Sequence, residues 1–223
     1  MKSLPLPYPP RRAFIGTTDR APKGGMAENL GKSEVAEELT DSLKRAVAAI
    51  EEQGVPYLLG GGLGCWARGG PPSSNDIDLM VKPEDAERAQ EALADAGMRP
   101  ESPPEQWLLK AFDGEILVDL IFEPSGMQID DEVIARGDEL SVMAMNIRVM
   151  NLNDILITKL MALDEHSVDY GDLILITRSL REQIDWARIR EETASSPFAV
   201  AFFALADGLG ICPGAQQPAP VES

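Results

Sequence analysis

The feature that most constrains the fold is an apolar strand that runs into three glycines and is followed by a second strand that carries two aspartates. The first strand is expected at 55–59, and Gly60, Gly61 and Gly62 then turn the chain into a short helix. Glycines let a phosphate approach the backbone, and a helix N-terminus offers unpaired N–H groups. A glycine cluster alone is weak evidence, because it occurs in any tight strand-to-helix turn.

Asp76 and Asp78, at the start of the second strand (77–81), make this stretch more specific. Residues two apart in a strand point to the same face, so the two carboxylates repel each other unless a cation compensates them. Magnesium does this well, because it takes hard oxygen ligands and shares them with substrate phosphates. The alternative for an isolated Asp-x-Asp is a solvated pair at the end of a strand.

A third carboxylate, Asp119, lies in a strand expected at 115–122 that is otherwise apolar. Burying a lone acid without a partner is costly. If this strand lies beside 77–81, Asp119 joins the same site. We therefore expect Asp76, Asp78 and Asp119 to ligate the metal.

Gly61-Gly62, thirteen intervening residues and Asp76-Ile-Asp78-Leu, with a later acid on a neighbouring strand, resemble the nucleotidyltransferase superfamily of the DNA polymerase β type. The resemblance implies that the acids hold two divalent ions, Mg²⁺ or alternatively Mn²⁺, which orient a nucleoside triphosphate and activate an acceptor hydroxyl. It also implies that the two glycines cradle phosphates and that Asp119 helps to deprotonate the acceptor.

Two further nucleotide-binding residues follow from the same resemblance. Ser74 takes the place of the serine in the Ser-x-Asp-x-Asp motif. Many relatives carry an arginine two positions before that serine, where this chain has Pro72. Arg68 is the candidate that would replace the missing charge.

The helical second half narrows the resemblance. Lys159, in a segment that begins Asn151-Leu-Asn-Asp, and the later Asp169-Tyr-Gly-Asp172 resemble the AbiEii/MenT type of bacterial nucleotidyltransferase toxin. This implies that Lys159 neutralises triphosphate charge and that Asp169 and Asp172 lie near the catalytic cleft, where they orient Lys159 or the acceptor. It further implies a toxin that transfers NMP from an NTP such as ATP to RNA, for example the 3′ end of tRNA, and that has a cognate antitoxin.

The net charge of the chain leaves other classes of acceptor as alternatives. The chain has 20 Lys and Arg against 37 Asp and Glu, a net charge of -17, which counts against a large RNA footprint. A strongly acidic cleft suits a cationic aminoglycoside, so small-molecule nucleotidyl transfer is the first alternative, with a protein acceptor as a weaker version. The other alternative is a non-catalytic nucleotide-binding module.

The expected fold class is α+β, with a small mixed sheet and flanking helices followed by a helical lobe. The boundaries are a disordered tail at 1–32 (with Met26 as an alternative start), a catalytic domain at 33–150, the helical lobe at 151–210 and a tail at 211–223. Within these, a helix is expected at 33–53, a hairpin at 107–122 and one strand at 140–149.

The composition also bears on the cellular location of the protein. Two cysteines and one histidine form neither a disulfide framework nor a zinc site. No apolar run reaches the roughly 18 residues that indicate a membrane span, and the N-terminus has no signal-peptide core. We therefore expect a cytoplasmic protein without a membrane partner.

Overall fold

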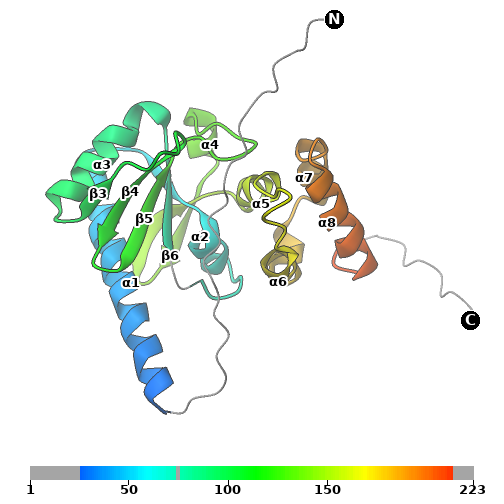
Figure 1. The fold of residues 1–223 in the computed structure, drawn as a ribbon, viewed down its shortest axis with the longest axis horizontal. Coiled ribbons are helices and arrows are strands. Elements are labelled where there is room, and N and C mark those ends of the chain that lie inside the picture. The colour runs from blue at the N-terminus through cyan, green and yellow to red at the C-terminus, as the bar shows by residue number, and fades with distance from the viewer. Residues whose placement is uncertain (1–25, 74–75, 213–223) are drawn as a thin grey trace, which may run out of the picture.

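The computed structural model describes residues 26–73 and 76–212, with side chains from residue 37 onward, and this part of the chain contains a seven-stranded mixed sheet (Figure 1). The strands lie in the order β3-β4-β5-β2-β1-β7-β6. The pairs β2–β5 and β1–β7 are parallel and the other neighbours are antiparallel. The strand bounds are β1 Tyr57–Leu59, β2 Asp76–Val81, β3 Arg99–Glu101, β4 Leu108–Asp113, β5 Ile116–Ile121, β6 Asp138–Val142 and β7 Met145–Val149.

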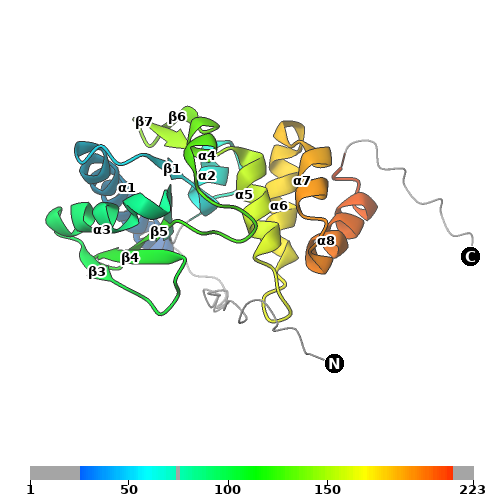
Figure 2. The same ribbon diagram turned by 90° about the horizontal axis from the view of Figure 1, so that it is seen from above.

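Helices cover the sheet and then form a group of their own. In Figures 1 and 2 the last four helices lie together to one side of the sheet, and α5 is the one nearest to it. The helix bounds are α1 Met26–Glu52, α2 Gly61–Ala67, α3 Ala86–Asp95, α4 Asp131–Ala135, α5 Leu152–Met161, α6 Tyr170–Leu180, α7 Trp186–Glu192 and α8 Pro197–Gly208, with short 3-10 helices at Pro83–Asp85 and Arg181–Gln183.

The alternation of side chains in β2 divides the protein into two apolar cores. Ile77, Leu79 and Val81 belong to the core that includes Leu43 of α1. Since neighbouring residues point to opposite faces, Asp76, Asp78 and Met80 face the other way. Met80 joins the second core, which also contains Ile155 of α5 and further apolar side chains of the helical lobe. The aspartates therefore lie on the face of the sheet that the helical lobe covers.

Several expectations are confirmed. The fold is α+β, with a mixed sheet followed by helices. The first hairpin forms as β4 and β5, and Gly114 in its turn has a φ of +61°.

Other expectations are corrected. Helix α1 begins at Met26, so residues 26–32 are helical rather than part of a tail. The segment expected as one strand at 140–149 is instead a hairpin of β6 and β7, because Met143 and Ala144 take the left-handed φ values of 49° and 62°. Such turns favour Asn and Gly, so this pair of residues does not predict one. Strand β3 was not expected, because it contains Pro100, which a sheet tolerates only at an edge.

The predicted tails at 1–25 and 213–223 lie outside the described residues. Within the described part, no helix combines the length and the apolarity that crossing a bilayer requires. The domain boundary at 150 stays a prediction. The second apolar core contains side chains from both sides of it, among them Leu58, Met80, Ile155 and Phe202.

Candidate active site

A row of charged side chains crosses three adjacent strands on the face of the sheet toward the helical lobe. In the strand register Lys110 of β4 lies opposite Asp119 of β5, and Asp119 lies opposite Asp78 of β2. The Lys110 Nζ is 3.9 Å from the Asp119 Oδ1, which is too long for a hydrogen bond. Within the described residues, this Oδ1 is the one buried side-chain oxygen or nitrogen without a hydrogen-bond partner.

The surroundings disfavour negative charge on all three predicted metal ligands. Burial raises the pKa of Asp119 to about 7, and the charge of Asp78 adds to this while Lys110 opposes it. Burial also raises the pKa of Asp78, and Lys159 counteracts the rise. The pKa of Asp76 is raised by burial too, although this residue is exposed at the start of β2. Three carboxylates that resist ionisation together form a site that a cation would stabilise.

The glycines let helix α2 approach this row closely. Gly61 has a φ of +54°, and a Cβ at this position would lie 1.6 Å from the Asp78 Oδ2. A hydrogen bond from the backbone N–H of Gly62 lowers the pKa of Asp78. A Cβ on Gly62 would lie 2.2 Å from the Oγ of Ser73. The glycines therefore contact Asp78 directly, and their expected role in cradling phosphates stays a prediction.

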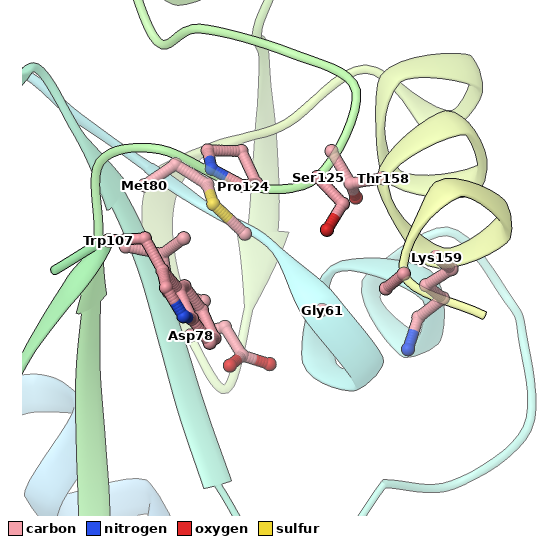
Figure 3. Close-up of a pocket in the computed structure, with 10 residues that line it drawn as sticks. Gly61, Asp78, Met80, Trp107, Pro124, Ser125, Thr158 and Lys159 are labelled. Carbon is pink, nitrogen blue, oxygen red and sulfur yellow. The ribbon is translucent and has the colours of Figure 1, made fainter. Parts of the chain in front are cut away.

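A cavity of about 190 Å³ opens beside Asp78, between the sheet, helix α5 and the loop after β5 (Figure 3). Figure 3 shows Asp78 and Lys159 at the same end of the cavity, on either side of Gly61. Within the described residues, Lys159 forms no ion pair shorter than 4 Å. The lining residues are Gly61, Asp78, Met80, Trp107, Ile121, Pro124, Ser125, Thr158, Lys159 and Ala162.

Helix α5, which carries Lys159, is fixed by a buried ionic contact. Asp154 is fully buried; its Oδ2 lies 3.1 Å from the Nε of Arg136, and its Oδ1 lies 2.5 Å from an Nη of Arg188. Arg136 follows α4 and Arg188 belongs to α7, so this carboxylate joins three segments. The position of Lys159 relative to the sheet depends on these contacts.

The structure places Arg68, a predicted nucleotide-binding residue, away from the cavity, and its role in binding nucleotide stays a prediction. The guanidinium of Arg68 donates to the backbone oxygens of Val149 and Met150 and pairs with Asp138 at 2.7 Å. Its side chain is only 9% exposed. Arg68 therefore holds α2 against the β6–β7 hairpin, and it does not line the cavity.

The structure does not place the remaining predicted residues at the cavity. Ser74 lies outside the described residues. Asp169 caps helix α6 by accepting a hydrogen bond from the backbone N–H of Gly171 at 2.8 Å. Asp172 is exposed in the first turn of the same helix. Neither acid lines the cavity or forms an ion pair with Lys159 in the described part of the chain, so their catalytic roles stay predictions.

Sequence reasoning missed the apolar and hydroxyl lining of the cavity. Trp107 is the first residue of the predicted hairpin, and Thr158 is adjacent to Lys159, so both lay in or beside recognised motifs. Ser125 lies in a loop without a recognisable pattern. Asp154 was also missed, although an acid between Asn153 and three apolar residues was a detectable signal.

The residues present fit a divalent cation only in part. Among the described residues, no three His, Cys, Asp or Glu side chains converge as a ready-made site. The Asp119 Oδ1, which has no hydrogen-bond partner, and the carboxylate of Asp78 opposite it in register nevertheless supply hard oxygen ligands. Asp78 and Asp119 would thus hold the ion, and Asp76 would join when its exposed side chain turns toward them.

The fold resembles solved structures of antibiotic adenylyltransferases. A solution structure of the antibiotic-resistance factor ANT(2'')-Ia is 16% identical, with a TM-score of 0.55, and the match covers 77% of this chain and 96% of that one. A crystal structure of ANT(2'')-Ia in complex with adenylyl-2''-tobramycin is 17% identical, with a TM-score of 0.53, and the match covers 74% and 97%. At these identities the likeness shows the fold alone.

No match was found among curated proteins. The narrower resemblance to AbiEii/MenT-type toxins is not confirmed by the matches reported above. A model of the family described as "uncharacterised nucleotidyltransferase" matches residues 28–207, which include the acid row, the glycines and helix α5. The chain therefore belongs to this nucleotidyltransferase family.

Proposed function

We propose that this nucleotidyltransferase moves a nucleotidyl group from an NTP, with ATP as the first candidate, to a hydroxyl group of a small cationic acceptor. The observation that carries the proposal is the Asp78–Asp119 pair with its unpartnered oxygen. Lys159 and the Gly61 turn face the same opening. Carboxylates that would hold a divalent ion on one side, and a cationic side chain on the other, are what positioning a triphosphate requires.

The chemistry follows from these side chains. The acceptor oxygen forms a bond to the α-phosphorus, the bond between that phosphorus and the β-bridging oxygen breaks, and pyrophosphate leaves. Asp119 accepts the hydroxyl proton as the general base. Lys159 offsets the charge that grows on the leaving pyrophosphate. A bound divalent ion would supply further charge neutralisation and would hold the phosphates in line.

Two observations favour a small cationic acceptor. The net charge of -17 attracts cations and repels polyanions. ANT(2'')-Ia, which shares the fold, was solved with an adenylylated tobramycin. Transfer to RNA, with an antitoxin as partner, is the competing hypothesis. It rests on the sequence motif of Lys159, Asp169 and Asp172.

The decisive experiment incubates the purified chain with each α-labelled NTP in turn, with Mg²⁺ or Mn²⁺ and with one of three acceptor sets. These are a panel of amino-bearing hydroxyl compounds such as aminoglycosides, total tRNA, and lysate protein. Asp78→Asn is the inactive control, and Glu115→Gln, an exposed acid in the turn between β4 and β5, is the matched control that keeps activity.

Label in a small molecule, with equimolar pyrophosphate, supports the proposal if Asp78→Asn abolishes it. Label in tRNA would instead support the toxin hypothesis and refute the proposed acceptor class. If no acceptor is labelled with any NTP, the catalytic proposal itself is refuted, and the chain is a nucleotide-binding module at most.

A further inference from the structure

The lining of the cavity is charged at one end and apolar elsewhere. Asp78 and Lys159 lie at one end, and Met80 and Pro124 lie toward the other (Figure 3). Ile121 adds a further apolar side chain to the lining. Amines of a cationic acceptor would lose their hydration against these apolar side chains without gaining partners, which is costly. A flat heterocycle has two apolar faces and needs hydrogen bonds at its edge alone.

The size of the cavity sets a second limit. At about 190 Å³ it lies below the roughly 300–1,000 Å³ of pockets that enclose a drug-sized ligand. It therefore holds one part of a molecule, and the rest must leave through the mouth. A nucleotide has this shape, with a planar base at one end and phosphates that would emerge between Asp78 and Lys159.

Trp107 provides a fixed aromatic surface in the cavity. Its backbone oxygen accepts hydrogen bonds from the N–H groups of Phe122 and Glu123 at 3.1 and 3.2 Å, so the residue is held against the end of β5. The ring is half-buried. Within the described residues, its indole N–H has no hydrogen-bond partner. A rigid aromatic ring with one polar edge still unsatisfied suits stacking against a ligand.

Two hydroxyl groups lie at the other side of the cavity. Figure 3 shows the Ser125 hydroxyl pointing into the space beside Thr158. The Thr158 hydroxyl donates to the backbone oxygen of Ile155 at 2.9 Å, so it faces a ligand as an acceptor. The Ser125 loop is seated on α5 by Gly126, where a Cβ would lie 2.6 Å from the Cγ of Met161.

We infer that this cavity is the nucleobase site, in which the base stacks on Trp107 and the hydroxyls of Ser125 and Thr158 meet its edge. The triphosphate then extends past Asp78 toward Gly61 and Lys159. This inference rests on the proposed function. It assigns the apolar cavity to the donor, and so places the acceptor on the exposed side of the row, near Asp76 and Asp119.

The test separates base contacts from phosphate contacts by calorimetric titration with two probes, Mg-ATP and Mg-tripolyphosphate. Trp107→Ala removes the stacking surface, Trp107→Phe keeps an aromatic ring, and Ala162→Phe fills the cavity from α5. Trp186→Phe, on α7 outside the cavity, is the matched control. Stacking predicts that Trp107→Ala weakens ATP binding about 5- to 150-fold. Tripolyphosphate binding should stay within about twofold, and Trp107→Phe should recover most of the ATP affinity.

Ala162→Phe should abolish ATP binding and leave tripolyphosphate binding unchanged. This second variant keeps the test decisive if Trp107→Ala does not fold. Wild-type binding of ATP with no selective loss in either variant overturns the nucleobase site and leaves the proposed function standing. A wild-type chain that binds neither probe overturns both.

Discussion

Replacing Asp119 by Asn should stabilise the metal-free protein at alkaline pH while it abolishes nucleotidyl transfer. The Asp119 Oδ1 is buried without a hydrogen bond, and Asp78 lies opposite it in the neighbouring strand. The ionised carboxylate is therefore poorly accommodated when no cation is bound. Asn keeps the shape of the side chain and removes the charge. The free energy of unfolding should therefore rise while transfer activity is lost.

The size of the effect follows from the pKa of Asp119, which rises from an ordinary 3.8 to about 7 in the folded state. Between these two values the folded protein binds more protons than the unfolded chain. The free energy of unfolding therefore falls as the pH rises toward 7 and is lowest above it. Between pH 5.5 and pH 8, ionisation of Asp119 should lower the free energy of unfolding of the wild type by about 2 kcal/mol.

Urea unfolding in EDTA at pH 5.5 and pH 8 measures this difference. Between the two pH values, the free energy of unfolding of the wild type should fall by about 2 kcal/mol more than that of Asp119→Asn. Glu115→Gln, which removes an exposed acid from the same hairpin, should behave like the wild type. Adding Mg²⁺ at pH 8 should stabilise the wild type and leave Asp119→Asn unchanged. Equal pH dependence in the wild type and Asp119→Asn would refute the reasoning.

Three further substitutions test the rest of the site. Gly61→Ala would place a Cβ against Asp78 and should lower kcat/KM about 100-fold, as expected when a catalytic group is displaced by about 1 Å. In Gly208→Ala the new Cβ meets open space, so kcat/KM should not change. Asp154→Asn breaks a buried ionic contact and should lower the free energy of unfolding by about 3 kcal/mol in urea titrations; an unchanged midpoint would contradict the role assigned to it. Arg68→Met should cost about 1–3 kcal/mol of stability and leave KM for the NTP within about twofold, and a large rise in KM would restore its predicted contact with nucleotide.

The acid row was predictable from sequence because its pattern is local. An aspartate in a strand of apolar residues, as at Asp119, is conspicuous in any window of seven residues. The spacing of Asp76 and Asp78 fixes their common face, since strand geometry has a period of two. What the pattern could not fix is the pairing of β2 with β5, which brings Asp78 opposite Asp119. That register depends on contacts between segments about 40 residues apart.

The partners of Arg68 could not be predicted from the sequence. A basic residue near a glycine turn is compatible with phosphate, and the sequence does not reveal a competing partner. In the fold, Asp138 and the backbone oxygens of Val149 and Met150 take up the guanidinium from 70 or more residues away. The cavity lining was missed for the same reason, because Trp107, Ser125 and Thr158 come from three separate segments.

In the proposed mechanism the helical lobe contributes Lys159 to the site, and the position of Lys159 depends on how helix α5 is held. Asp154 and Lys159 are five residues apart on α5; the first is joined to α4 and α7, and the second opens onto the cavity. The Asn153 side chain also accepts a hydrogen bond from the backbone N–H of Asp185 at 2.8 Å. A rotation of α5 would break these contacts as it moved Lys159 away from Asp78. The buried ionic contact thus keeps Lys159 opposite the carboxylates, which is the arrangement that the proposed phosphoryl-type transfer needs.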